Sequence, residues 1–205
     1  MAKLPQIAIA YPSGDMVHAD FALALAGLCL SMHPLETTVI NTKSSIVAEA
    51  RNMAVQRARE AEAQYLLFLD SDMIFPQSAL HRLLLHQKDV VGAVYTKRVA
   101  PYDLLGTVLP NTVPPGDDGL VEMLRLPTGC LLIKMSVFDV LPQPWFRFLV
   151  DEENGSLLGE DYAFCDMARM AGFKLWADFS LSQEIGHIGQ QICRLPTAQE
   201  TKSEP

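Results

Sequence analysis

One short segment in the middle of the chain constrains the fold more than any other. Five consecutive apolar residues, Tyr65–Leu69, run directly into two carboxylates, Asp70 and Asp72. An apolar run of this length predicts a buried strand, central in a parallel sheet. Ligands of open α/β sheets bind at the carboxyl ends of the strands, where this pair would lie. The pair therefore indicates either a divalent cation that bridges to phosphate oxygens or a polar turn in which one Asp caps the next helix.

Composition places the chain among globular proteins. Its 205 residues are 49% hydrophobic and 20% charged, so we expect a single domain with a substantial core. The net charge of -8, with no local Lys/Arg cluster to offset it, argues against stable nucleic-acid binding. Four scattered cysteines without a Cys-x-x-Cys pair favour reduced thiols in the cytoplasm. The sequence shows neither a signal-peptide pattern nor an apolar run near the roughly 20 residues of a membrane span, so we expect a soluble protein.

The first half of the chain, to about residue 98, alternates between strand-like and helix-like segments. We expect strands at 7–11, 37–41, 65–69 and 90–95, and helices at 18–32, 45–63 and 77–86. Ser44 or Ser45 is the predicted cap of the second helix. This alternation predicts an α/β fold with a doubly wound, mostly parallel central sheet and flanking helices.

The second half, about 99–196, predicts a smaller region of short strands and loops. Residues 110–119 are rich in Pro, Gly and Asp, which indicates a loop between strands at 105–108 and 120–124. Further strands are expected at 130–133, 174–177 and 182–185. Helices are expected at 136–141, capped by Ser136, and at 161–171, ended by Gly172. We predict one domain over 1–196 and a disordered polar tail over 197–205.

Four further motifs accompany the Asp-Ser-Asp triplet. They are Ala50-Arg51-Asn52, Thr128-Gly129-Cys130, Gly159-Glu160-Asp161 and Gly186-His187. An Asp-x-Asp triplet alone is a weak signal, but the ordered set is much more specific. With this set the chain resembles a compact glycosyltransferase of the GT-A fold, similar to the family 2-like enzymes that use nucleotide-diphosphate sugars. The resemblance covers nearly the whole chain.

The resemblance implies how a sugar donor would be bound. Asp72 and His187 would ligate a divalent cation, and Asp70 would contact the nucleotide ribose and belong to the same metal site. Mn²⁺ is favoured over Mg²⁺ because an imidazole ligand suits it better. The cation would bridge the diphosphate of a UDP- or GDP-sugar and assist departure of the leaving group. The other residues implied in donor binding are Pro12, Ser13, Arg51 and Ser71.

The resemblance also implies a catalytic base at the start of the 161–171 helix. We assign the base to Asp161, with Glu160 as the second catalytic carboxylate, because two adjacent and partly desolvated carboxylates raise the pKa of one of them. The helix dipole also favours acidic residues there, whatever the chemistry. Gly129 and Trp145 are predicted to line the acceptor side. Because the chain lacks the Gln-x-x-Arg-Trp motif of processive members, we expect an inverting, single transfer to an unidentified acceptor.

Other interpretations stay open from the sequence alone. Arg51 could be a surface arginine paired with Glu49 or Glu60, and His187 could be a polar residue in a Gly-rich turn. Two basic residues at a strand end are interpreted as surface charges rather than phosphate contacts: Lys97 and Arg98. Two other functions compete with sugar transfer. One is a haloacid dehalogenase-like phosphatase, which also has Asp-x-Asp after an apolar strand; the other is a non-catalytic nucleotide-sugar-binding protein.

Overall fold

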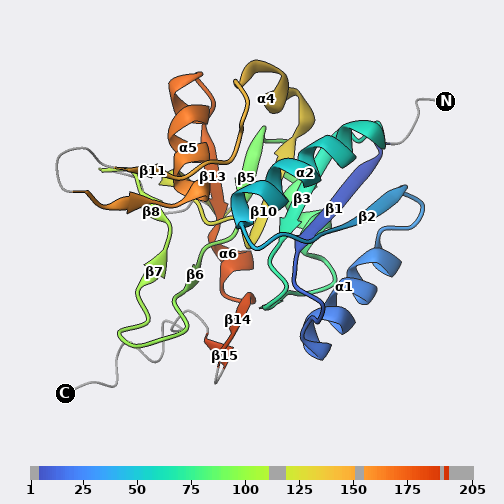
Figure 1. Cartoon of the computed structure of the whole chain (residues 1–205). Coiled ribbons are helices and arrows are strands. Elements are labelled where there is room, and N and C mark those ends of the chain that lie inside the picture. The colour runs from blue at the N-terminus through green and yellow to red at the C-terminus, as the bar shows by residue number, and fades with distance from the viewer. Residues whose placement is uncertain (1–4, 111–118, 151–154, 190–191, 194–205) are drawn as a thin grey trace.

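The computed structural model describes residues 5–110, 119–150, 155–189 and 192–193 (Figure 1). An eight-stranded sheet forms its centre. Both halves of the chain contribute strands to this sheet, which confirms an α/β fold. In spatial order the strands are β2 (Thr37–Thr42), β1 (Ile7–Pro12), β3 (Tyr65–Leu69), β10 (Cys130–Lys134), β5 (Val90–Gly92), β13 (Leu175–Asp178), β9 (Leu120–Arg125) and β8 (Thr107–Val108).

The sheet is mixed, which corrects the expectation of a mostly parallel sheet. β1 pairs in parallel with β2 and β3, and β13 pairs in parallel with β5. The other four neighbouring pairs are antiparallel, because β10 lies between β3 and β5 and because β9 lies between β13 and β8. The apolar run of β10 does indicate a strand buried on both faces. Burial alone, however, carries no information on strand direction.

Helices cover both faces of the sheet and give the molecule three layers. α2 (Val47–Glu60), α4 (Met135–Val140) and α5 (Glu160–Met170) pack on one face. α1 (Ala19–Ser31), α3 (Ala79–Leu85) and α6 (Phe179–Ser182) pack on the other. Side chains of β3 alternate between the two cores, as the pleat of a strand requires: Leu66 and Phe68 face the first, and Leu67 and Leu69 face the second.

Three smaller sheets complete the fold. β4 (Met73–Ile74) pairs with β14 (Gly186–Ile188), which also pairs with β15 (Ile192–Cys193). β6 (Tyr95–Thr96) pairs with β7 (Leu104–Leu105), and β11 (Leu149–Val150) pairs with β12 (Leu157–Leu158). β4 follows β3 along the chain, and β6 follows β5. The small sheets that contain β4 and β6 therefore lie beyond the carboxyl ends of two central strands.

Helix starts differ from the predicted ones. α2 begins at Val47 and no side chain caps it. The Ser44 hydroxyl instead accepts a hydrogen bond from the Ile46 amide at 3.0 Å, so this serine forms a local turn before the helix. α4 begins at Met135, which places Ser136 inside the helix rather than at its cap.

The segment predicted as a strand at 182–185 is the end of α6 and a turn. The reason is Asp178, whose carboxylate accepts a hydrogen bond from the Leu181 amide at 2.7 Å and so caps a helix at that point. No helix in the described part of the chain is both long and apolar enough to cross a bilayer. The predicted tail at 197–205, and residues 111–118 of the predicted loop, lie outside the described residues.

Candidate functional site

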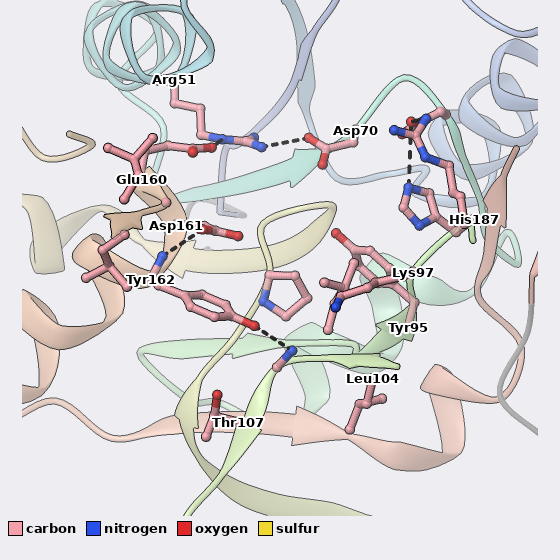
Figure 2. A pocket seen from close by; sticks show the side chains of 18 residues that line it. Arg51, Asp70, Tyr95, Lys97, Leu104, Thr107, Glu160, Asp161, Tyr162 and His187 are labelled. Carbon is pink, nitrogen blue, oxygen red and sulfur yellow. Dashed lines mark hydrogen bonds and ion pairs between the residues drawn. The ribbon is translucent and has the colours of Figure 1, made fainter. Parts of the chain in front are cut away.

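The carboxyl edge of the sheet holds most of the predicted site. β1, β3, β5 and β13 run in the same direction, so the segments that follow them gather at one edge. A cavity of ≈ 670 Å³ opens there, and Figure 2 shows the side chains that line it. Six of the predicted site residues line this one cavity: Arg51, Asp70, Asp72, Glu160, Asp161 and His187.

Arg51 joins three elements at the floor of the cavity. Its side chain comes from α2 and is 4% exposed. Its Nη2 donates to Asp70 Oδ1 at 2.9 Å and its Nε donates to Glu160 Oε1 at 3.0 Å (Figure 2). Burial works to lower the pKa of Arg51, but the two carboxylates outweigh it and raise that pKa. Arg51 is therefore a buried bridge from the end of β3 to the start of α5, which corrects the alternative of a surface pair with Glu49 or Glu60.

Asp161 is the carboxylate that this bridge leaves without a cationic partner. Its Oδ1 accepts a hydrogen bond from the Tyr162 amide at 2.8 Å. Burial, together with the negative charge of Glu160, raises the pKa of Asp161 from its usual 3.8 to about 6. A carboxylate with that pKa is still mostly ionised at neutral pH and is a stronger base than an ordinary aspartate, so it suits general base chemistry.

Asp72 and His187 face one another at the other end of the cavity. Backbone pairing of β4 with β14 brings them together, and the Ile188 amide donates to the Asp72 carbonyl oxygen at 2.7 Å. His187 Nδ1 lies 2.9 Å from the Thr96 carbonyl oxygen and therefore carries the proton that it donates there. Nε2 lies 3.6 Å from Asp72 Oδ2. Burial works to lower the pKa of His187, but the hydrogen bonds to Asp72 and to the Thr96 carbonyl oxygen outweigh it and raise that pKa. A metal would bind the ring at Nε2 once this nitrogen has lost its proton. An imidazole held through its other nitrogen in this way is the usual form of a metal-ligating histidine.

A divalent cation held between Asp72 and His187 would replace Arg98, whose Nη1 is 2.7 Å from the same Asp72 Oδ2. One carboxylate oxygen and one imidazole nitrogen suit Mn²⁺. In the described part of the chain no group of three His, Cys, Asp or Glu side chains is arranged around a metal position. The two side chains would therefore be the protein's share of the coordination, with oxygens of a ligand or of water supplying the rest.

The charge of the cavity favours the same interpretation. Four carboxylates line it, and only three cationic side chains, Arg51, Lys97 and Arg98, oppose them. Arg98 Nη1 is 2.7 Å from Asp72 Oδ2, and Lys97 Nζ is 3.0 Å from Asp103 Oδ2. An anionic diphosphate would therefore enter a site that is not positively charged on its own. A bound cation would supply the missing charge.

Gly129 lies directly under Asp70. Its carbonyl oxygen accepts from the Asp70 amide at 3.1 Å, and its own amide donates to the Tyr95 hydroxyl at 2.9 Å. A Cβ at this position would overlap the Tyr95 hydroxyl and lie 3.1 Å from Asp70 Oδ2. Gly129 thus allows close packing beneath the carboxylate, and it is absent from the residues that line the cavity.

Five predicted site residues are absent from the lining of the cavity: Gly129, described above, and four others. Trp145 is 2% exposed, and its Nε1 donates to the carbonyl oxygens of Phe138 and Leu141; it lines a separate cavity beside α2 rather than this one. Ser13 accepts a hydrogen bond from Asn41 at 2.8 Å and lines a separate hollow at the same edge of the sheet. The remaining two are Pro12, which precedes Ser13, and Ser71, which lies between Asp70 and Asp72 in the sequence.

Sequence reasoning missed three contributors to the site. Tyr95 is buried, packs edge-on against the His187 ring at 5.1 Å, and has a pKa that burial raises well above its usual value. The Thr96 carbonyl oxygen fixes the tautomer of His187. Arg98 is half exposed, in keeping with the interpretation as a surface charge, but it also pairs with Asp72 and lines the cavity. The signal available for all three was their place just beyond a buried strand, where the site of an α/β sheet gathers.

Comparisons with known proteins bear on the fold alone. No protein-family model matches the chain, and no curated protein is similar to it in sequence. Among solved structures it is similar to the crystal structure of A197 from STIV, with a TM-score of 0.62. The match covers 94% of this chain and 95% of that one, at 15% identity. At that identity the likeness shows a shared fold and leaves the function to be argued from the cavity.

Proposed function

We propose that the protein is a metal-dependent glycosyltransferase with a GT-A-like fold. It would move a sugar from a nucleotide-diphosphate sugar to an acceptor hydroxyl, with inversion and in a single transfer. One observation carries the proposal: a carboxylate–imidazole pair suited to a cation and a carboxylate with a raised pKa line the same cavity. The first would hold the diphosphate end of a donor and the second would activate an acceptor.

Asp161 has the role of general base in this proposal. Its carboxylate takes the proton of the acceptor hydroxyl while the hydroxyl oxygen forms a bond to the anomeric carbon of the sugar. The bond from that carbon to the diphosphate oxygen breaks, and its electron pair leaves with the nucleoside diphosphate. Attack on the face opposite the leaving group inverts the configuration. Asp161 then releases its proton to solvent.

Asp72 and His187 would hold the divalent cation, Mn²⁺ rather than Mg²⁺. When bound, that ion supplies Lewis-acid stabilisation of the charge on the departing diphosphate. Asp70, at the end of β3, would accept hydrogen bonds from the ribose of a UDP- or GDP-sugar. Arg51 bridges Asp70 and Glu160 and orients both, so we treat it as a positioning residue rather than a diphosphate ligand.

A thermal-shift experiment tests the donor site. The protein is heated with UDP, GDP, UDP-glucose or GDP-mannose, with and without Mn²⁺. We expect one nucleotide series to stabilise the protein only when Mn²⁺ is present, by about 3 kcal/mol at 100 times the dissociation constant. The shift should disappear in Asp72→Ala and persist in Asp103→Ala, a control that removes an exposed carboxylate outside the cavity lining.

Activity measurements, made beside the thermal shift, separate the competing functions. Hydrolysis of p-nitrophenyl phosphate without any nucleotide-dependent shift would replace the proposal with a phosphatase. Donor binding without hydrolysis or transfer, unchanged by Asp161→Asn, would indicate a nucleotide-sugar-binding protein. The absence of a shift with any nucleotide in the presence of Mn²⁺ would contradict a donor site in this cavity.

A further inference from the structure

The lining of the cavity includes apolar side chains beside its charged ones. The charged residues include the candidate metal ligands Asp72 and His187, with Arg98. The apolar residues are one proline and four leucines from β7, β12 and the segment before β10: Pro127, Leu104, Leu105, Leu157 and Leu158. β7 pairs with β6 next to Thr96, on the side of His187, whereas β12 leads into α5 on the side of Asp161. A donor diphosphate would bind at the charged residues, which leaves the apolar side chains next to Asp161 to the other substrate.

The apolar part adjoins the proposed base through the chain itself. Leu157 and Leu158 form β12, and Gly159 alone separates them from α5, whose second residue is Asp161. All four residues line the cavity. A molecule that presents its hydroxyl to Asp161 must therefore lie close to these leucines.

Two polar groups next to the leucines of β12 already have partners. The Tyr162 hydroxyl accepts a hydrogen bond from the Gly106 amide at 2.9 Å (Figure 2). It is also hydrogen-bonded by Thr107. Asp161 Oδ1 accepts from the Tyr162 amide. The leucine side chains offer no hydrogen bond, so hydroxyls of a sugar acceptor that lay against them would lose their hydrogen bonds to water, which is unfavourable.

One of these leucines is largely exposed. Leu157 is 65% exposed, and its partner in register on β11, Val150, is 63% exposed. Val150 does not line the cavity, so the two side chains differ in their place relative to it although their exposure is nearly equal.

From these observations we propose that the acceptor is an alcohol or phenol with an apolar body, rather than a sugar or another polyol. This inference rests on the proposed sugar transfer. The acceptor O–H gives its proton to the Asp161 carboxylate, and its oxygen bonds to the anomeric carbon. The carbon–oxygen bond to the diphosphate breaks with its electron pair, so the products are an alkyl or aryl glycoside and a nucleoside diphosphate. The body of the acceptor lies against the leucines of β12.

A homologous series of acceptors tests this inference. Transfer is measured with the donor identified by thermal shift, Mn²⁺, and ethanol, 1-butanol, 1-hexanol or benzyl alcohol, with glycerol and glucose as polar comparisons. We expect kcat/KM to rise about fourfold for each methylene that the leucines cover. Benzyl alcohol should exceed glycerol and glucose by at least tenfold. The hexanol and benzyl arms distinguish an alkyl body from an aryl one.

Leu157→Asn supplies the variant and Val150→Asn its matched control. The two side chains are partners on adjacent strands with nearly equal exposure, but only Leu157 lines the cavity. Leu157→Asn should lower kcat/KM for 1-hexanol by roughly five- to tenfold and leave the donor-dependent thermal shift unchanged. Val150→Asn should change neither by more than about twofold.

Three other results would overturn the inference. Equal kcat/KM along the alcohol series, or a preference for glycerol or glucose, with donor binding and hydrolysis intact, would overturn the apolar acceptor and leave the sugar transfer standing. Equal effects of the two substitutions would overturn the assignment to this wall of the cavity. If no nucleotide sugar binds, the proposed function and this inference fall together.

Discussion

At the scale of single residues, the site depends on how the buried charges share their partners. Arg51 has two carboxylate partners, Asp70 and Glu160, whereas Asp161 has none of opposite charge within hydrogen-bonding distance among the described residues. The charged form of Arg51 is therefore strongly stabilised, whereas the charged form of the nearby Asp161 is poorly stabilised. Such an arrangement fits a functional site, because the uncompensated carboxylate is the one whose proton affinity rises.

Asp161→Asn should inactivate the protein and stabilise it. The folded-state pKa of about 6 lies above the usual value of 3.8, so the carboxylate opposes folding. This cost is absent below pH 3.8, grows between pH 4 and 6, and is complete above about pH 6. At pH 7 the substitution should add up to about 3 kcal/mol of unfolding free energy, since one pKa unit corresponds to about 1.4 kcal/mol. Urea denaturation at pH 4 and pH 7 measures the difference.

The pH dependence of transfer by the wild-type protein tests the same assignment of Asp161 through activity. Transfer should increase as pH rises through about 6, because Asp161 must be ionised to accept a proton. Asp161→Asn should lower kcat by about 100-fold or more. A variant that kept its activity, or that lost stability equally at both pH values, would contradict the assignment of the base.

Arg51→Ala should destabilise the protein strongly. Removing the guanidinium leaves Asp70 and Glu160 close together without their shared cation, and breaking a buried ion pair in this way costs about 3–5 kcal/mol. Arg59→Ala is the matched control on the same helix, because its ion pair with Asp139 is exposed and is worth about 1 kcal/mol or less. Chemical denaturation compares the two. A loss no larger than that of Arg59→Ala would contradict the argument that Arg51 stabilises the fold as a buried ion-pair bridge.

At the scale of secondary-structure elements, strand pairing decides which carboxylates meet. The apolar run of β3 and the two carboxylates after it could be recognised in the sequence, and so could the helix that presents Glu160 and Asp161. The 90–95 run was predicted as one strand. The structure instead ends β5 at Gly92 and starts β6 at Tyr95, which turns Tyr95 and Thr96 toward His187. Such a break depends on pairing with β7 and leaves no periodic signal in the sequence.

The aromatic residues show the same limit in another way. Trp145 and Phe146 could equally have lined a sugar site or filled a core, because both environments favour large apolar side chains. The structure places the Phe146 ring 4.9 Å from that of Phe164, in a stacked arrangement, and both are buried. Only the packing of α4 and α5 on the sheet decides between these roles. That packing depends on residues far apart in the chain and cannot be predicted from the local sequence.

Gly129→Ala tests the turn that supports the end of β3. The added methyl would overlap the Tyr95 hydroxyl and lie 2.7 Å from Tyr95 Cζ, which belongs to a buried ring that cannot move freely. We expect a loss of about 1–3 kcal/mol of stability and a weaker Mn²⁺-dependent nucleotide shift, because the Asp70 amide is held by the Gly129 carbonyl oxygen. Gly14→Ala is the control, since it has nothing within 4 Å. Equal thermal stability of the two variants would contradict this packing argument.

At the scale of the whole molecule, the two halves predicted from the sequence are interleaved in space. β3 and β5, from the first half, do not pair with each other, because β10 from the second half lies between them. The candidate site repeats this arrangement, with Asp70 and Asp72 from the first half and Asp161 and His187 from the second. The order of motifs along the sequence suggested a donor half and an acceptor half, but only the pairing of β10 shows that they share one sheet.

A fragment of residues 1–98 should therefore not fold, although it contains four of the strands of the central sheet and three helices. Without β10, β3 and β5 would expose the backbone groups and the buried side chains that now contact it, and the loss of that apolar contact removes most of what stabilises an α/β sheet. Amide NMR spectra of the fragment should show the narrow dispersion of an unfolded chain, while the full chain unfolds in urea in a single transition. A fragment with well-dispersed amide signals and cooperative unfolding would show instead that residues 1–98 fold on their own. In that case the cavity would have to form by docking of two folded parts.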